Sequence, residues 1–579
     1  MPKLNHAKTK RALLALLVFG HAENSFAVDA GQQLNQIERI QDQAEPLNTL
    51  PTIESEKPLL KPQQDGFRTQ IKQFVFEGNQ LFSSTQLQAY LKEYLNRDIT
   101  FDELKLAVDG ITLFYKEQGY LATATLPKQD ISEGSVSIII VEAKFGGAKI
   151  DGDTDKAYRV DPTVIKRFIE ANNPLDQALN LNALDRAVLI ANELPGVSVS
   201  QSLQKGSQAG QVESLVKLSN RAGYVVSATA DNYGFKSTGR DRYLGSAALF
   251  SPTGVGDRVD LTYLHTEGND YGRLAYARPI GYSGLNVGIN GSALKYQVVT
   301  GAGLSSQLKG TAETLEIQAS YPTIKTRGLS LTNSASIEAK HFKNTSTDGL
   351  ESDYMVNVAS VGGALNHHNS LTLAGESSAA LDVDLGYTDY DKSPTDFAVP
   401  KANSRVDGQF ARLRWNLINT QFYTETIRSV VKFNGQFADS NLDSSQKFYL
   451  GGATGIRAYP SSEGGGSNGF LINLELHKEL PGNFTVTGFY DYGHAKQYVD
   501  NSYKTNGNSI TVDGEKNSFN MKGYGASLEW RGDFAKFRPT VSLVWSKRIG
   551  HNPNPQSDGS DSDGSQPGDF YWVNGSINF

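Results

Sequence analysis

The stretch "FYWVNGSINF", residues 570–579, ends the chain and decides how its second half folds. Alternate side chains of a β-strand point to opposite faces. One face of this strand carries Tyr571, Val573, Gly575, Ile577 and Phe579, and the other carries Trp572, Asn574, Ser576 and Asn578. The first face suits lipid and the second suits a polar interior, as in a strand that lies in a membrane.

From Gly223 onward, fifteen more segments of about ten alternating residues precede this strand. Short turns such as "PTGVGD" and "PGN" alternate with long polar loops at 390–408, 440–469, 498–519 and 549–569. Outer-membrane barrels have this asymmetry, whereas a soluble β-sandwich or β-helix gives no reason for it. The sequence therefore predicts a β-barrel membrane protein, with 16 antiparallel strands seated in the lipid bilayer over residues 222–579.

The N-terminus has the features of a secretory signal peptide. Basic residues precede the apolar run "ALLALLVFG" (12–20), which is too short to span a bilayer. Ser25 and Ala27 stand at the usual cleavage spacing, so we expect residues 1–27 to be removed. A short membrane anchor is the alternative. No later segment has 18 consecutive apolar residues, so the sequence predicts no transmembrane helix.

Residues 28–45 predict a short helix with a thin apolar stripe. Leu34, Ile37 and Ile40 recur every third residue among glutamine and asparagine. Such a helix is marginal alone and needs a polar-tolerant pocket. Residues 46–68 carry several prolines and little periodicity, which indicates an extended linker.

Residues 69–145 and 146–221 predict two copies of one α+β unit, each in the order strand, helix, helix, strand, strand. In the first copy, Thr100 and Glu103 form a capping box at the start of the second helix. In the second copy, we expect the corresponding helix to begin behind Asn182. Helices packed on a small mixed sheet leave a strand edge exposed. The exposed edge is either only an aggregation hazard or a site where an extended peptide adds a strand.

Composition and motifs exclude several functions. The chain has no Cys and a formal net charge of −7, which exclude disulfides, thiolate metal sites and a basic nucleic-acid surface. "GGSNG" (465–469) lacks the strand before and the helix after that a nucleophile elbow needs. The Asp spacing of 558–569 is wrong for a calcium loop, and His367 and His368 would point to opposite faces of a strand. We expect no catalytic residue, metal or cofactor.

One arginine in the second of the long loops is unexplained by its surroundings. Arg457 lies in "YLGGATGIRAYPSSEGGGSNG" (449–469), whose glycines indicate unusual dihedrals or close backbone approach. Lys447 is the only other cation between Gln446 and Lys478, so Arg457 belongs to no basic patch. It is either a solvated surface arginine, which contributes little, or the partner of a distant residue.

The order of these parts resembles the two-partner secretion transporters, the TpsB family within the superfamily of barrels with POTRA domains. The resemblance covers essentially the whole chain after the signal peptide. In this superfamily the loop between strands eleven and twelve folds into the lumen, and its arginine meets an aspartate of an F-x-D-x-G motif on strand thirteen. Arg457 in "IRAYP" and Asp491 in "FYDYG" match that pair, with Gly451, Gly452, Gly455, Tyr459, Phe489 and Gly493 as further motif residues. Ala458 departs from the pattern, where glycine is more usual.

Strand alternation supports the pairing implied by the resemblance. Thr485, Thr487, Phe489 and Asp491 would face the lumen, and Phe484, Val486, Gly488, Tyr490 and Tyr492 would face lipid. Glu475 and His477 on the preceding strand face the same way as Asp491. The resemblance thus implies that Arg457 is a latch, which holds the loop 440–469 inside the barrel through a charge-assisted pair.

The resemblance also implies a location and a function. The barrel would lie in the outer membrane of a Gram-negative bacterium as a monomer, inserted by the barrel-assembly machinery with Phe579 as its terminal signal. The POTRA domains would lie in the periplasm and recognise the N-terminal domain of a large TpsA-type exoprotein. The pore would secrete this partner unfolded and without ATP, and the helix 28–45 would plug it at rest.

Two other functions remain possible at this point. An insertase of the same superfamily shares the barrel and the loop, but usually carries more POTRA units and lacks the plug helix. In a solute porin, which is the other alternative, the periplasmic repeats would have no function. The sequence leaves the cargo open among a haemolysin, an adhesin and a contact-dependent inhibition toxin.

Overall fold

The computed structural model describes most of the chain. The described residues are 29–41, 68–151, 157–301, 303–394, 406–500, 502–505, 508–511, 517–553, 555–556, 559–565 and 568–579. The expected signal peptide, residues 1–27, and the expected linker up to residue 67 lie outside the described residues. Among the helices that are described, none is long and apolar enough to cross a membrane.

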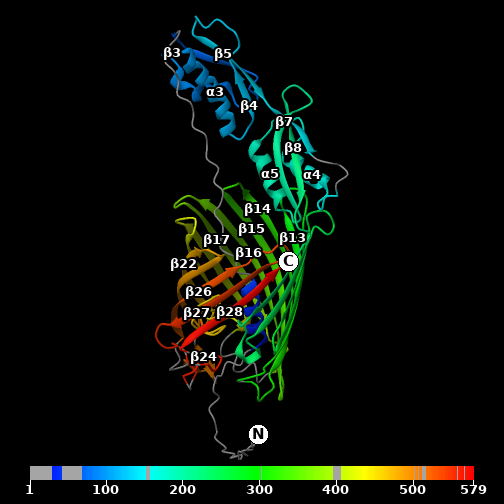
Figure 1. Ribbon diagram of the computed structural model, residues 1–579, viewed down its shortest axis with the longest axis vertical. Coiled ribbons are helices and arrows are strands. Elements are labelled where there is room, and N and C mark those ends of the chain that lie inside the picture. The colour runs from blue at the N-terminus through cyan, green and yellow to red at the C-terminus, as the bar shows by residue number, and fades with distance from the viewer. Residues whose placement is uncertain are drawn as a thin grey trace, which may run out of the picture.

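Sixteen strands close into one antiparallel barrel, which confirms the predicted fold (Figure 1). Each strand pairs with the next barrel strand along the chain, and the last pairs with the first. Every segment predicted from the alternation corresponds to one barrel strand. The strands are β9 (Tyr224–Asp231), β10 (Arg242–Phe250), β11 (Arg258–His265), β12 (Asn269–Pro279), β13 (Asn286–Gln297), β14 (Lys309–Lys325), β15 (Leu329–Ser346), β16 (Gly349–Asn369), β17 (Ala374–Asp389), β18 (Gly408–Phe422), β19 (Ile427–Ala438), β22 (Asn468–Leu480), β23 (Phe484–Lys496), β26 (Ser518–Arg531), β27 (Arg538–Arg548) and β28 (Asp569–Asn578).

The barrel wall is apolar outside and largely polar inside. Large apolar side chains lie exposed on the outward face of β11 to β15, as contact with lipid requires, and they include Leu261, Leu274, Ile289, Leu315 and Ile337. Their neighbours on the same strands turn inward and are buried, among them Asn290, Ser292 and Thr314. Strands β14, β15 and β16 are 17, 18 and 21 residues long, so they extend well beyond the span that a bilayer needs.

Two α+β units precede the barrel, and a small hairpin extends from one of its loops. In the first unit (residues 68–143) the sheet order is β2-β5-β4, with β2 parallel to β5. The second unit (residues 144–220) repeats this with the order β6-β8-β7. The elements are β1 (Arg68–Gln70), β2 (Gln73–Glu77), α2 (Ser84–Tyr90), η1 (Lys92–Tyr94), β3 (Asp98–Thr100), α3 (Phe101–Glu117), β4 (Ala122–Thr125) and β5 (Ser135–Glu142), then β6 (Lys144–Asp151), α4 (Pro162–Asn172), α5 (Leu181–Glu193), β7 (Val197–Lys205) and β8 (Gln211–Asn220), with β24 (Ser502–Thr505) and β25 (Asn508–Thr511) in the hairpin and η2 (Lys236–Thr238) after β9.

Local sequence explains where the long helices of these units begin. Thr100 caps α3, because its hydroxyl accepts from the backbone N–H of Glu103 and the Glu103 carboxylate accepts from the backbone N–H of Thr100. The latter bond holds the pKa of Glu103 below its ordinary value. Helix α5 begins earlier than expected. Its cap is Asn180 rather than Asn182, because the amide oxygen of Asn180 reaches the N–H of Ala183.

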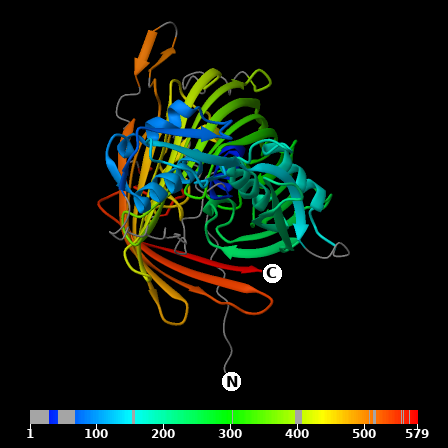
Figure 2. The same ribbon diagram turned by 90° about the horizontal axis from the view of Figure 1, so that it is seen from above.

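A short helix lies inside the barrel. Helix α1 (Ala30–Gln41) is enclosed by the ring of strands, whereas the two α+β units stand at one end of it (Figures 1 and 2). Because β9 follows the second unit directly, the barrel end near Tyr224 is the unit end. The opposite end, which carries the long loops, is the loop end.

Candidate functional site

The loop between β19 and β22 folds into the barrel. It contains η3 (Ser444–Gln446) and the short strands β20 (Phe448–Tyr449) and β21 (Gly465–Gly466), which pair with each other. Its apolar side chains pack against the inner wall, and this burial favours the inward position. The small core comprises Leu450, Ile456, Ala458 and Tyr459 of the loop with Leu471, Ala495, Phe519 and Met521 of the wall.

Arg457 of this inward loop faces Asp491 of β23. Its Nη2 donates to Oδ1 at 2.7 Å and its Nε donates to Oδ2 at 3.0 Å, which makes a two-bond fork. The backbone N–H of Arg457 donates a third bond to Oδ2 at 3.0 Å. The Asp491 side chain is 0 % exposed and that of Arg457 is 11 % exposed, so the pair is shielded from water. A bidentate pair of this kind fixes orientation as well as distance.

Residues of β22 and β23 complete the surroundings of the arginine. Glu475 accepts from the arginine Nη1 at 2.9 Å, and His477 bonds the other oxygen of Glu475 at 3.0 Å. Asn473 donates to Oδ1 of the aspartate at 2.7 Å, a contact that was not predicted from the sequence. Its position two residues before Glu475, on the same face of the strand, was the available signal. The guanidinium also lies 3.4 Å from the ring centre of Phe489, in cation–π contact.

The backbone of Arg457 is held by the other side of the wall. Its carbonyl oxygen accepts from Ser546 Oγ on β27 at 2.5 Å and from Trp572 Nε1 on β28 at 2.7 Å. The sequence placed Trp572 on the inner face but gave it no role. Arg457 therefore contacts β22, β23, β27 and β28. It links the loop to the last part of the wall, which ends at β28, the strand that pairs with β9 and closes the barrel.

The glycines near the pair allow the loop and wall to approach closely. A Cβ on Gly493 would lie 2.7 Å from Cδ2 of Leu450 and 2.9 Å from Cδ1 of Ile456, too close for a side chain. Gly452 has a φ of 117°, which disfavours other residues, and it accepts the N–H of Gly455 at 3.0 Å in the turn before Arg457. The N–H of Gly451 donates to the carbonyl of Glu463 at 2.9 Å across that turn.

Ala458 replaces the usual glycine without distorting the backbone. It is absent from the positive-φ residues of the described chain, so this turn does not require glycine. Its methyl group instead packs onto Gly523 of β26, where an added Cβ would lie 2.5 Å away. Close packing of loop and wall at this point therefore depends on Gly523.

Tyr459 and Glu463 tie the inward loop to the last external loop. The Tyr459 ring is buried beneath Arg548, whose guanidinium lies 4.6 Å from the ring centre and pairs with Asp561 at 2.6 Å. The carboxylate of Glu463 accepts the backbone N–H of Ser562 at 2.8 Å. These contacts left no signal in the sequence, because they join residues about a hundred positions apart.

Helix α1 fills the lumen beside the inward loop. Leu34 and Ile37 are 0 % and 4 % exposed and pack in one cluster with inward aromatic residues of the wall such as Tyr296 and Phe342. Ile40 belongs to the helix, but its side chain lies outside the described residues. The thin apolar stripe of the sequence thus faces the wall.

Polar side chains join α1 to the inward loop. Arg39 donates to the carbonyl oxygens of Tyr449 and Gly451, the latter at 2.9 Å. Asn35 donates to the carbonyl oxygen of Ser445 at 2.9 Å. The sequence gave no sign of these partners, which are backbone atoms more than 400 positions away. Helix and loop therefore form one connected insert in the lumen.

Other polar side chains join α1 to the wall. Lys340 of β15 donates to Glu38 at 2.8 Å and has a side chain only 7 % exposed. Gln33 donates to Thr238 Oγ1 at 3.1 Å and accepts from Asn269 at 3.0 Å. Because both partners of each bond are polar, water can replace these particular bonds at modest cost.

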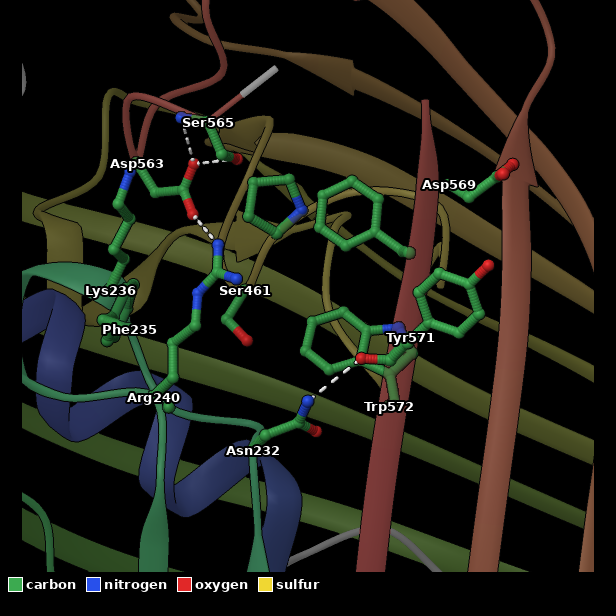
Figure 3. A pocket seen from close by; sticks show the side chains of 13 residues that line it. Asn232, Phe235, Lys236, Arg240, Ser461, Asp563, Ser565, Asp569, Tyr571 and Trp572 are labelled. Atoms are coloured by element: carbon green, nitrogen blue, oxygen red, sulfur yellow. Dashed lines mark hydrogen bonds and ion pairs between the residues drawn. The ribbon is translucent and has the colours of Figure 1, made fainter. Parts of the chain in front are cut away.

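The barrel closes at a short seam beside a cavity of about 320 Å³ (Figure 3). β28 and β9 share five residue pairs, whereas β9 and β10 share eight. Beyond the ladder, Asn232 continues the pairing with its side chain, donating to the Tyr571 carbonyl at 3.0 Å and accepting the Val573 N–H at 2.9 Å. Arg240 and Asp563, 2.8 Å apart, pair above it.

Two family models match the chain. The model described as "Haemolysin secretion/activation protein ShlB/FhaC/HecB" matches residues 213–514, and that described as "POTRA domain, ShlB-type" matches residues 69–143. The heme/hemopexin transporter protein HuxB of Haemophilus influenzae is 25% identical over 552 residues, which cover 91% of this chain and 92% of that protein. The outer membrane transporter CdiB of Dickeya dadantii is 24% identical, covering 73% of this chain and 76% of its own length.

Solved structures share the fold. CdiB from Escherichia coli matches with a TM-score of 0.70 at 16% identity, over 95% of this chain and 98% of that one. CdiB from Acinetobacter baumannii matches with a TM-score of 0.66 at 15% identity, over 95% of this chain and 97% of that one. At such identities these likenesses establish the fold alone.

The location follows from the family. Its members are two-partner secretion transporters of the outer membrane, their POTRA domains lie in the periplasm, and their partners are large exoproteins. The unit end of the barrel thus faces the periplasm and the loop end faces the outside. The first family model spans more than half of this chain. The chain therefore belongs to the ShlB/FhaC/HecB family of haemolysin secretion/activation proteins.

Proposed function

We propose that the chain is a translocation pore that recognises a large exoprotein in the periplasm and secretes it unfolded to the cell surface. The observation that carries the proposal is the insert of α1 and the inward loop. It fills the lumen and, besides its apolar contacts with the wall, it is held there by polar side chains, such as Glu38 on Lys340 and Arg457 on Asp491. A pore that must open for a polypeptide needs an insert that water can replace.

Recognition falls to the α+β units in this proposal. Each sheet has two edge strands, β2 and β4 in the first unit and β6 and β7 in the second. An extended segment of the exoprotein can add a strand to such an edge, and its main-chain hydrogen bonds supply affinity. Val75 of β2 and Val141 of β5 are 39 % and 49 % exposed on the sheet, which offers apolar contacts for the added strand.

Several further assignments belong to the same proposal. Residues 1–27 are a cleaved signal peptide, and residues 146–221 form a second POTRA domain with the element order of the first. Phe579, 57 % exposed at the chain end, is read by the barrel-assembly machinery, and the barrel works as a monomer. Transport needs no ATP because folding of the exoprotein outside biases its direction, and we infer a transport role rather than a catalytic one.

The test is secretion of a partner from cells that lack any other transporter of this family. The curated relatives include a heme/hemopexin transporter, the transporter CdiB and a haemolysin transporter. The exoprotein partner of each of these three kinds of transporter is therefore co-expressed with the chain. We expect one type to reach the medium or cell surface, normalised to transporter in the outer membrane. If no exoprotein is exported but depletion of the chain reduces other outer-membrane barrels, the insertase function replaces this proposal.

A further inference from the structure

One row of apolar side chains crosses the inner wall of the barrel. Its members lie on successive strands, from β11 to β16, and each is directly paired with the next. All of them point into the lumen, and none is more than 2 % exposed. The apolar row consists of Leu264, Tyr271, Leu294, Ala312, Phe342 and Tyr354. Leu244 of β10 extends it on one side, and Tyr390 stacks on Tyr354 on the other, with 4.4 Å between the ring centres.

The inner positions on either side of the apolar row are mostly polar. Nearer the unit end, the next inward residues of the same strands are Thr262, Arg273, Ser292, Thr314, Lys340 and Val356, of which only Val356 is apolar. Nearer the loop end, the next inward residues include Asn269, Asn344 and Ser352, all of them buried. A barrel lumen is ordinarily polar. An unbroken apolar row between two mostly polar rows therefore has a cause of its own.

Docking of helix α1 accounts for only part of the apolar row. The helix packs against β13, β14 and β15, and its Leu34 and Ile37 lie in one cluster with the row. A helix with its side chains is about 10–12 Å wide, which matches two or three strands at a spacing of about 4.8 Å. The strands from β11 to β16 span roughly 24 Å of wall. Beyond β16 the inward loop covers the row instead, where Asp443 accepts from the hydroxyl of Tyr390 at 2.6 Å.

We propose that the apolar row contacts apolar side chains of the unfolded exoprotein during its passage through the pore. This inference rests on the function proposed above, in which the insert gives way to the polypeptide. Once α1 leaves, the row faces the vacated space, because the helix packs in one cluster with it. An unfolded chain carries its aliphatic and aromatic side chains into the lumen, and contact with the row removes both surfaces from water.

The chemistry of the apolar row suits a moving polypeptide. Apolar attraction has no direction, so the row accepts any apolar side chain and holds none of them in a fixed orientation. Paired residues lie across the strands rather than along them, so successive segments of the exoprotein pass the same row. An apolar band along part of a pore also disfavours water there, which limits the leakage of ions beside the polypeptide.

The experiment compares the secretion of two exoprotein fragments of equal length behind the same N-terminal domain. One fragment keeps its apolar residues, and in the other they are replaced by serine and asparagine. The variant Leu264→Asn/Leu294→Asn makes two positions of the apolar row polar, and Thr262→Asn/Thr314→Asn is the control in the adjacent polar row. We expect the row variant to secrete the apolar fragment about fivefold more slowly and the polar fragment at the unchanged rate. The control variant should secrete both fragments like the unchanged protein.

The polar fragment separates contact with the exoprotein from a defect of the insert. Weaker docking of α1 would change the secretion of both fragments alike, so equal effects on the two would overturn the inference and leave the row as a docking site for the helix. An unchanged rate for the apolar fragment would overturn it too. If the unchanged protein secretes neither fragment, the pore function itself fails, and the row loses its role with it. If the double variant forms no heat-modifiable barrel, Leu264→Asn alone, on β11, decides the question, with an expected loss of about twofold for the apolar fragment only.

Discussion

An arginine removed from water is tolerated only where its charge and its N–H groups meet acceptors. At the residue scale, Arg457 meets this condition through Asp491 and Glu475, and its own carbonyl satisfies Ser546 and Trp572. The resemblance named Asp491, and strand alternation placed Glu475 on the same face. Neither pointed to Ser546 and Trp572, since they lie on strands whose register with the loop depends on the closed barrel.

We predict that Arg457→Ala strongly reduces secretion while the barrel still assembles. Breaking a buried pair leaves an uncompensated charge on Asp491, at a cost of about 3–5 kcal/mol to the inward position of the loop. Asp491→Asn should act alike, and Arg457→Lys should rescue only in part, because lysine lacks the planar fork. Secreted partner is measured per transporter in the outer membrane, with Arg538→Ala as control, an arginine whose side chain is 77% exposed.

The double variant Arg457→Ala/Asp491→Asn is the sharper comparison. If the two side chains act through one contact, the double variant should be little worse than the more damaging single variant. Heat modifiability on gels shows that the barrel has formed in every case. Fully additive losses would mean that the residues act separately, and the latch assignment would be wrong.

At the scale of elements, α1 and the inward loop behave as one insert because they satisfy each other's polar groups. The apolar stripe of α1 predicted a helix that needs a sheltered site, and Leu34 and Ile37 are indeed buried. The stripe alone does not say which site. That choice depends on Arg39 and Asn35, whose acceptors are main-chain carbonyls of the loop and so leave no trace in side-chain patterns.

We predict that Arg39→Ala increases the open-channel conductance of the transporter in planar bilayers. Hydrogen bonds from a charged donor contribute about 1.5–3 kcal/mol each, so their loss should raise the fraction of time that α1 spends outside the lumen. Deleting residues 28–45 should give the largest conductance. Gln32→Ala is the matched control, since its side chain makes no hydrogen bond to a described residue. A deletion variant that conducts like the unchanged protein would rule out plugging by α1.

At the scale of the whole molecule, the sixteen strands were predictable because every one must separate lipid from lumen, which imposes a period of two on its side chains. The two α+β units were predictable from helix caps and apolar faces, although Asn180 rather than Asn182 begins α5. The lengths of β14 to β16 were not predictable, since outside the bilayer no lipid enforces the alternation. The hydrogen bonds from the Asn232 side chain to β28 were not predictable either, because there a side chain makes the contacts that a strand's main chain makes elsewhere.

The separation of units and barrel leads to a final prediction. The first unit has its own buried core, and its sheet shares no ladder with the barrel, so its removal should leave the barrel able to insert. We expect deletion of residues 68–143 to reduce secreted partner to background while heat-modifiable barrel remains in the outer membrane. Val75→Glu on edge strand β2 and Thr123→Glu on edge strand β4 then form a matched pair, because each adds one charge to one edge. The edge that receives the exoprotein should be the one whose variant secretes less. Secretion that survives the deletion would exclude recruitment by this unit, and the role would pass to the second unit or to the barrel itself.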